Sequence, residues 1–133
     1  MCIRDRVLLK SNHFALARPA TYEEVVRRAA AASHRDVIAE ARDLDEALAA
    51  VRGGAAVVLL DNFAPVAPLR GAVHAVRQEA ARLGRTVAIE ASGGVTLANV
   101  KDFAACGVDR ISVGALTHSV HALDLHMAVE PLA

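Results

Sequence analysis

Short apolar runs that alternate with helix-like stretches constrain the fold of this 133-residue chain more than any other feature. The apolar runs lie at residues 7–9, 36–41, 55–60, 86–90 and 109–113. The segments between them space their apolar residues as an amphipathic helix does. Strands that alternate with helices at intervals of roughly 20–30 residues indicate βα units, so the sequence predicts a parallel sheet.

Helix start signals support this alternation. Thr21 precedes one amphipathic segment and has Glu24 three residues later, a capping-box pattern that predicts a helix over residues 22–32. Asp43 and Glu46 repeat the pattern before the next segment. Thr96 is expected to cap a helix that reaches residue 106.

The length of the chain limits what such a series can build. A closed (β/α)₈ barrel needs about 250 residues, so this chain can hold only part of one. We expect an α/β fold, a partial (β/α) barrel with about five parallel strands, and an open doubly wound sheet is the structural alternative. The composition agrees, because 54% of the residues are hydrophobic and only 3% aromatic, as in aliphatic parallel strands covered by Ala-rich helices.

Charge and cysteine content exclude several classes of function. Fifteen basic residues balance fifteen acidic ones, so the sequence has no overall basic character for nucleic acid or for a membrane surface. No apolar run reaches the roughly 18 residues of a membrane span. Cys2 and Cys106 belong to no metal-binding pattern, and a reducing, cytoplasmic setting is the default expectation.

Polar residues or glycines end or follow each predicted strand. They are Lys10, Glu40, Asp61, the Ser92–Gly94 turn and Gly114. Functional groups of parallel α/β folds gather at the carboxyl ends of the strands. We therefore predict that these residues converge around one cleft, with Glu40 and Asp61 on the same face of the sheet.

Each of these residues also has a purely structural interpretation. Glu40 lies in an apolar run, so it could form a salt bridge inside a barrel or hold a metal ion. Asp61 could be a turn residue. The glycines of Ser92–Gly94 can form an anion-binding concavity, although such turns often bind nothing. His118 and His121 lack the companions of a metal site, and Cys106 is expected to be a core residue.

Four blocks of the sequence resemble one enzyme family, the quinolinate phosphoribosyltransferases, also called carboxylating nicotinate-nucleotide pyrophosphorylases. The order and spacing of the blocks agree with the family, and the last block is the most specific. The blocks are Val-Leu-Leu-Lys-Ser-Asn-His at 7–13, Leu-Leu-Asp-Asn-Phe at 59–63, Glu-Ala-Ser-Gly-Gly-Val at 90–95, and Gly-Val-Asp-Arg-Ile-Ser-Val-Gly-Ala-Leu-Thr-His-Ser at 107–119. The resemblance implies the barrel-like C-terminal domain of type II phosphoribosyltransferases.

The resemblance also implies a reaction and a set of site residues. Quinolinate and phosphoribosyl pyrophosphate would give nicotinate mononucleotide, pyrophosphate and carbon dioxide, with Mg²⁺, in NAD biosynthesis. Catalytic positions would be Lys10, Glu40 and Asp61, with the two carboxylates as tentative Mg²⁺ ligands. Asn12 and His13 would support them. Substrate phosphate would contact Ser92, Gly93, Gly94, Gly114, Ala115, Leu116 and His118.

Two departures from the family pattern qualify these expectations. Ser11 stands where the family usually has an acidic residue. Nothing in the chain matches the family's N-terminal domain or its Arg- and His-rich quinolinate site, and in the family that domain also covers the partner's site in a homodimer or larger oligomer. We expect residues 1–4 to be a non-native start, residues 5–133 to be the C-terminal part of the barrel domain, and this chain alone to be inactive. A paralogous barrel with another substrate and a non-catalytic phosphate-binding module are the alternatives.

Overall fold

Five strands form one all-parallel sheet in a computed structural model that describes residues 5–63, 65–117 and 123–129. The strands are β1 (Arg6–Leu9), β2 (Asp36–Ala41), β3 (Val57–Asp61), β4 (Ala88–Ser92) and β5 (Arg110–Ile111). Each pairs with the next along the chain, in the order β1-β2-β3-β4-β5. The predicted parallel sheet is confirmed, and the order runs in one direction without the reversal of a doubly wound sheet.

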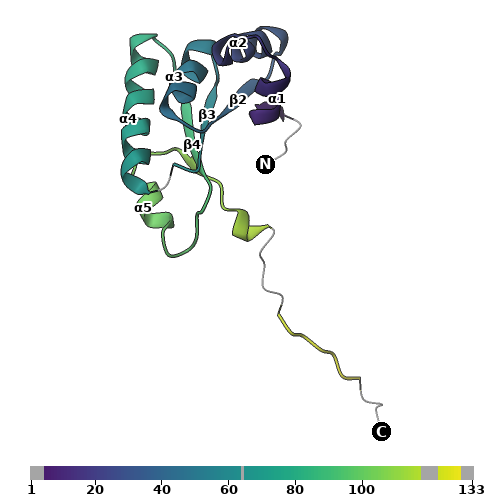
Figure 1. Cartoon of the computed structure of the whole chain (residues 1–133). Helices are drawn as coiled ribbons and strands as arrows, with labels where there is room; N and C mark the ends of the chain where they lie inside the picture. The colour runs from purple at the N-terminus through teal and green to yellow at the C-terminus, as the bar shows by residue number, and fades with distance from the viewer. Residues whose placement is uncertain (1–4, 64, 118–122, 130–133) are drawn as a thin grey trace.

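Five α-helices connect these strands (Figure 1). They are α1 (Ser11–Leu16), α2 (Tyr22–Ala32), α3 (Leu44–Gly53), α4 (Val66–Arg82) and α5 (Val100–Ala104). A 3₁₀ helix, Gly114–Leu116, follows β5. Helix α1 was not predicted, because its six residues are too few to display a helical period.

Helix boundaries follow the expected caps in α2 and α3 and depart from them in α5. The side chain of Thr21 accepts a hydrogen bond from the Glu24 amide, and that of Asp43 accepts one from the Glu46 amide. Thr96 does not cap α5, which begins after Asn99. The Asn99 side chain instead accepts a hydrogen bond from the Thr96 amide, so residues 97–99 form turns and the helix is shorter than predicted.

The helices cover one face of the sheet, and the main hydrophobic core lies between them. Strand residues Val58, Leu60 and Ile89 are fully buried there with Val51 of α3 and Val76 of α4. On the opposite face a second cluster contains only strand residues, with Ile38, Val57 and Leu59 at its centre. Because the helices pack on a single side, this second face corresponds to the interior of a barrel, and we call it the inner face.

The predicted partial barrel is therefore the observed architecture. β1 and β5 are the two ends of the strand order, and the described residues contain no pairing between them. Cys106 is buried in the core as expected. No helix among the described residues is long and apolar enough to cross a membrane.

Replacing Leu60 with Ala should destabilise the chain by about 2–5 kcal/mol, since this side chain is fully buried between the sheet and the helices. Urea unfolding followed by circular dichroism measures the loss. The matched control is Leu97→Ala, whose side chain is 91% exposed and should cost less than about 0.5 kcal/mol. Equal losses for the two variants would contradict the core described above.

Candidate functional site

Strand register places the polar residues on the inner face. Glu40 of β2 is opposite Leu59 of β3, and Leu59 is opposite Glu90 of β4. Because side chains alternate along a strand, Asp61 shares the face of Leu59 and therefore that of Glu40. The prediction that Glu40 and Asp61 lie on one face is confirmed, and both lie toward the carboxyl ends of their strands.

Lys10 and Glu40 form an ion pair on this face. The Lys10 Nζ atom lies 2.9 Å from Glu40 Oε2, and the Glu40 side chain is only 7% exposed. The hydrogen bond to Glu40, followed by its negative charge, raises the pKa of the Lys10 amine above its usual value, and Asp61 contributes in the same direction. Glu40 is thus the partner in a salt bridge, as one interpretation of the sequence had it, while Lys10 remains accessible to a ligand.

Two contacts hold the ends of β1 and β2 in place. The Tyr22 hydroxyl donates a 2.7 Å hydrogen bond to the Glu40 carbonyl oxygen, and burial raises the pKa of that hydroxyl, which keeps it a donor. The Lys10 amide donates a 3.0 Å hydrogen bond to His13 Nδ1. His13 therefore contacts the Lys10 backbone.

The end of β3 is tied to the turn after β4 by Asn62. This residue has a positive φ of 59°, and its amide donates to the Ser92 carbonyl oxygen at 2.9 Å. Its side chain donates to Asp61 Oδ2 at 3.1 Å. A Cβ atom on Gly93 would come within 2.2 Å of Asn62 Oδ1, so only glycine permits this close approach. Asp61 thus lies beside the glycine turn.

The glycine turn opens into a cavity of about 410 Å³. Gly93 and Gly94 have φ values of 92° and 63°, and the Asn99 side chain donates to the Gly94 carbonyl oxygen at 2.9 Å. The residues that line the cavity come from the turn and from the segment after β5. They are Ser92, Gly93, Gly94, Val95, Thr96, Ser112, Gly114 and Ala115. Two segments that the sequence singled out for anion binding therefore meet at one place.

The prediction that the rim residues converge around one cleft is met only in part, because the remaining predicted positions do not line this cavity. Lys10, Glu40 and Asp61 do not line it, although they share its edge of the sheet. Leu116 is 71% exposed and lines a neighbouring apolar cavity with Leu97. Asn12 belongs to the lining of a different cavity, described below. His118 lies outside the described residues.

Glu90 and Ser112 were quoted within sequence blocks but received no role, and the structure joins them on the inner face. Ser112 Oγ donates to Glu90 Oε1 at 2.5 Å, and Glu90 is 8% exposed. A sequence signal existed, because Glu90 is a carboxylate inside an apolar strand, as Glu40 is. Its partner could not be identified without the register between β4 and β5.

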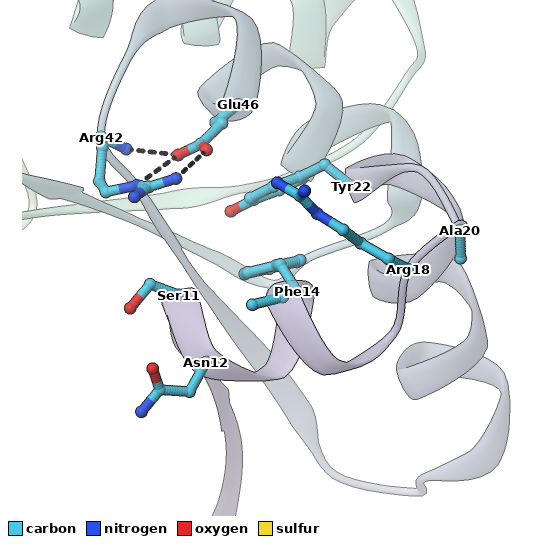
Figure 2. Close-up of a pocket in the computed structure, with 9 residues that line it drawn as sticks. Ser11, Asn12, Phe14, Arg18, Ala20, Tyr22, Arg42 and Glu46 are labelled. Atoms are coloured by element: carbon cyan, nitrogen blue, oxygen red, sulfur yellow. Dashed lines mark hydrogen bonds and ion pairs between the residues drawn. The ribbon is translucent and has the colours of Figure 1, made fainter.

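A separate cavity of about 340 Å³ lies beside α1 and α2 (Figure 2). Phe14 and Tyr22 stack in its wall with ring centroids 3.9 Å apart. Arg18 and Arg42 also line it, and Arg42 is held by Glu46 in an ion pair at 2.8 Å. It provides an alternative place where an anion could bind, so experiments must distinguish it from the glycine-lined cavity.

No group of three or more His, Cys, Asp or Glu residues in the described part of the chain is arranged to hold a metal ion. Protein ligands alone therefore do not form a metal centre there. Glu40 and Asp61 could supply two oxygen ligands if a substrate supplied others, which is the usual arrangement for Mg²⁺ bound with phosphates.

Comparisons with known proteins give a consistent result. Residues 1–128 match the family model described as quinolinate phosphoribosyl transferase, C-terminal domain. A probable carboxylating nicotinate-nucleotide pyrophosphorylase of Archaeoglobus fulgidus is 37% identical over 127 residues, which cover 96% of this chain and 47% of that protein. The carboxylating nicotinate-nucleotide pyrophosphorylase of Homo sapiens is 38% identical over 91% of this chain and 39% of its own length.

A solved structure resembles the fold as well. The nicotinate-nucleotide pyrophosphorylase of Francisella tularensis superposes with a TM-score of 0.72 and 32% identity, over 87% of this chain and 38% of that one. The chain thus spans less than half the length of these relatives.

Replacing Gly93 with Ala should destabilise the chain by about 2 kcal/mol or more, because the new methyl group meets Asn62 and the backbone is strained at positive φ. Gly94→Ala is the matched control, since it also has positive φ but no atom within 4 Å of the added Cβ. It should cost about 1 kcal/mol. Urea unfolding measures both, and a larger loss for Gly94→Ala would contradict the contact with Asn62.

Proposed function

The chain belongs to the quinolinate phosphoribosyl transferase family by its C-terminal domain, and from this we propose that its inner face binds the phosphoribosyl group of phosphoribosyl pyrophosphate. In the complete protein that group would pass to quinolinate, giving nicotinate mononucleotide, pyrophosphate and carbon dioxide. The observation that carries the proposal is the cavity shared by the Ser92–Gly94 turn and the Gly114–Ala115 segment. Asp61 lies beside that turn through Asn62.

The glycine-lined cavity is suited to the 5′-phosphate. Backbone amides near residues with positive φ can form an anion-binding concavity, and the glycines let a phosphate approach the chain closely. The Ser92, Thr96 and Ser112 side chains add hydroxyl groups around the cavity. A phosphate bound there would fix the ribose relative to the carboxylates, and such orientation can contribute several kcal/mol to catalysis.

The carboxylates are suited to the charge that develops on the ribose. A ribosyl oxocarbenium ion carries positive charge, which Glu40 and Asp61 can stabilise from a fixed position. Lys10 can bind a substrate carboxylate or the pyrophosphate as a point charge. Its contact with Glu40 keeps both side chains oriented before the ligand binds. This assignment requires no protein nucleophile.

Magnesium and the partners follow from the same proposal. Mg²⁺ bound to the pyrophosphate would neutralise negative charge on the leaving group, with Glu40 and Asp61 as its protein ligands. Quinolinate would be held by an Arg- and His-rich site, which no segment of this chain matches. The complete protein would act as a cytoplasmic homo-oligomer. A non-catalytic phosphate-binding module is the second candidate, because one cavity of this chain already contains both glycine segments.

Inorganic phosphate and ribose 5-phosphate should bind this chain weakly, whereas quinolinate should bind poorly, because one Lys cannot replace the paired contacts that several Arg side chains make with two carboxylates. Isothermal titration calorimetry measures all three. In Gly94→Asp an added carboxylate should abolish phosphate binding, whereas Gly84→Asp should not affect it. The two glycines are matched, since both have positive φ near 60° and open space around the added Cβ. Tight quinolinate binding without phosphate binding would refute the proposal.

A further inference from the structure

Charged side chains cross the inner face at one level of the sheet. The register pairs Glu40 of β2 with Leu59 of β3, Leu59 with Glu90 of β4, and Glu90 with Arg110 of β5. Extending the pairing of β1 with β2 by one residue places Lys10 opposite Glu40. Lys10 and Glu40 form an ion pair at one side of Leu59. On the other side no ion pair joins Glu90 to Arg110 among the described residues, and the Arg110 Nη1 atom is itself buried without a hydrogen-bond partner. Glu90 is therefore a buried carboxylate that lacks the partner its counterpart Glu40 has.

One oxygen of Glu90 has no hydrogen-bond partner. Ser112 donates to Oε1, while Oε2 is buried and unpaired among the described residues. A buried carboxylate oxygen without a donor costs free energy, commonly about 1–3 kcal/mol or more for a charged group. Buried polar atoms without a partner are rare in folded proteins, and a ligand-binding site is one place where such an atom has a reason to persist. Arg110, its register partner, supplies no hydrogen bond to this oxygen, so an O–H or N–H group of a ligand could do so.

The surroundings of Glu90 indicate which donor that is. Ser92 lies two residues further along β4 on the same face and lines the glycine-lined cavity, as does Ser112. Glu40 and Asp61 share the inner face with Glu90. Glu90 does not line that cavity itself, but its neighbours Ser92 and Ser112 do, so a ligand would approach Glu90 through the space on the inner face next to the cavity. A sugar attached to the phosphate would occupy that space and present hydroxyl groups.

We propose that Glu90 is a further ligand-binding residue, whose Oε2 accepts a hydrogen bond from a hydroxyl group of the ribose while Ser112 fixes the carboxylate through Oε1. This inference rests on the proposed function and extends it to the sugar. Glu90 then discriminates a phosphorylated sugar from free phosphate, because a sugar hydroxyl reaches Glu90 while the phosphate stays in the glycine-lined cavity. The phosphate itself gains nothing from this carboxylate.

The test compares two ligands on Glu90→Gln. The Gln carbonyl can still accept from Ser112, but its NH₂ group replaces the acceptor Oε2 with a donor. Calorimetry with ribose 5-phosphate should show an affinity about tenfold lower than for the unchanged chain, as expected for loss of a hydrogen bond to a charged acceptor. Affinity for inorganic phosphate should stay the same. Glu24→Gln, on the surface of α2, is the control and should change neither affinity.

A second measurement uses the unchanged chain, so that it does not depend on how the variant folds. The side-chain carboxyl ¹³C resonance of Glu90 should shift when ribose 5-phosphate is added and should not shift with inorganic phosphate. A carboxyl resonance that ignores ribose 5-phosphate, or a Glu90→Gln chain that keeps its preference for the sugar phosphate, would overturn the assignment. If the unchanged chain binds neither ligand, the proposed function fails, and this inference fails with it.

Discussion

The helices that build the core pack on one face of the parallel sheet, and this one-sided packing determines which strand side chains are buried beneath them. Helix burial takes every second strand residue into the aliphatic core, as Val58, Leu60 and Ile89 illustrate. The alternate residues must then face the other way. Toward the amino ends they form a small apolar cluster around Ile38 and Val57, and toward the carboxyl ends they become carboxylates, hydroxyls and Lys10. One alternation thus produces both the core and the candidate site.

The two buried glutamates show how this face combines stability with binding. Glu40 is compensated within the chain by Lys10, and its backbone is held by Tyr22. Glu90 is compensated only in part, through Ser112. A fully paired carboxylate orients a neighbouring cation, whereas a partly paired one retains affinity for a donor. Both occupy the same level of the register and each has a basic neighbour, Lys10 after β1 and Arg110 on β5, but among the described residues only Lys10 forms the ion pair.

Much of this arrangement could be predicted from the sequence. Apolar runs located all five strands, and the rule that parallel strands carry function at their carboxyl ends placed Lys10, Glu40 and Asp61 on one rim. Register could not be predicted, because it depends on contacts between segments, so the Glu90–Ser112 pair was missed. The start of α5 was also missed, because the Asn99 side chain bonds back to the Thr96 amide and residues 97–99 form turns, which only the folded segment reveals.

Mapping the ribose 5-phosphate site by ¹⁵N–¹H correlation spectra of this chain tests the account most directly. If the phosphate binds in the glycine-lined cavity, the largest changes affect the surrounding amides of Gly93, Gly94, Gly114 and Ala115. The cavity beside α1 and α2 supplies an internal comparison, because Arg18 and Arg42 could also attract an anion. Changes confined to residues around those two arginines, with the four glycine-loop amides unaffected, would contradict the account.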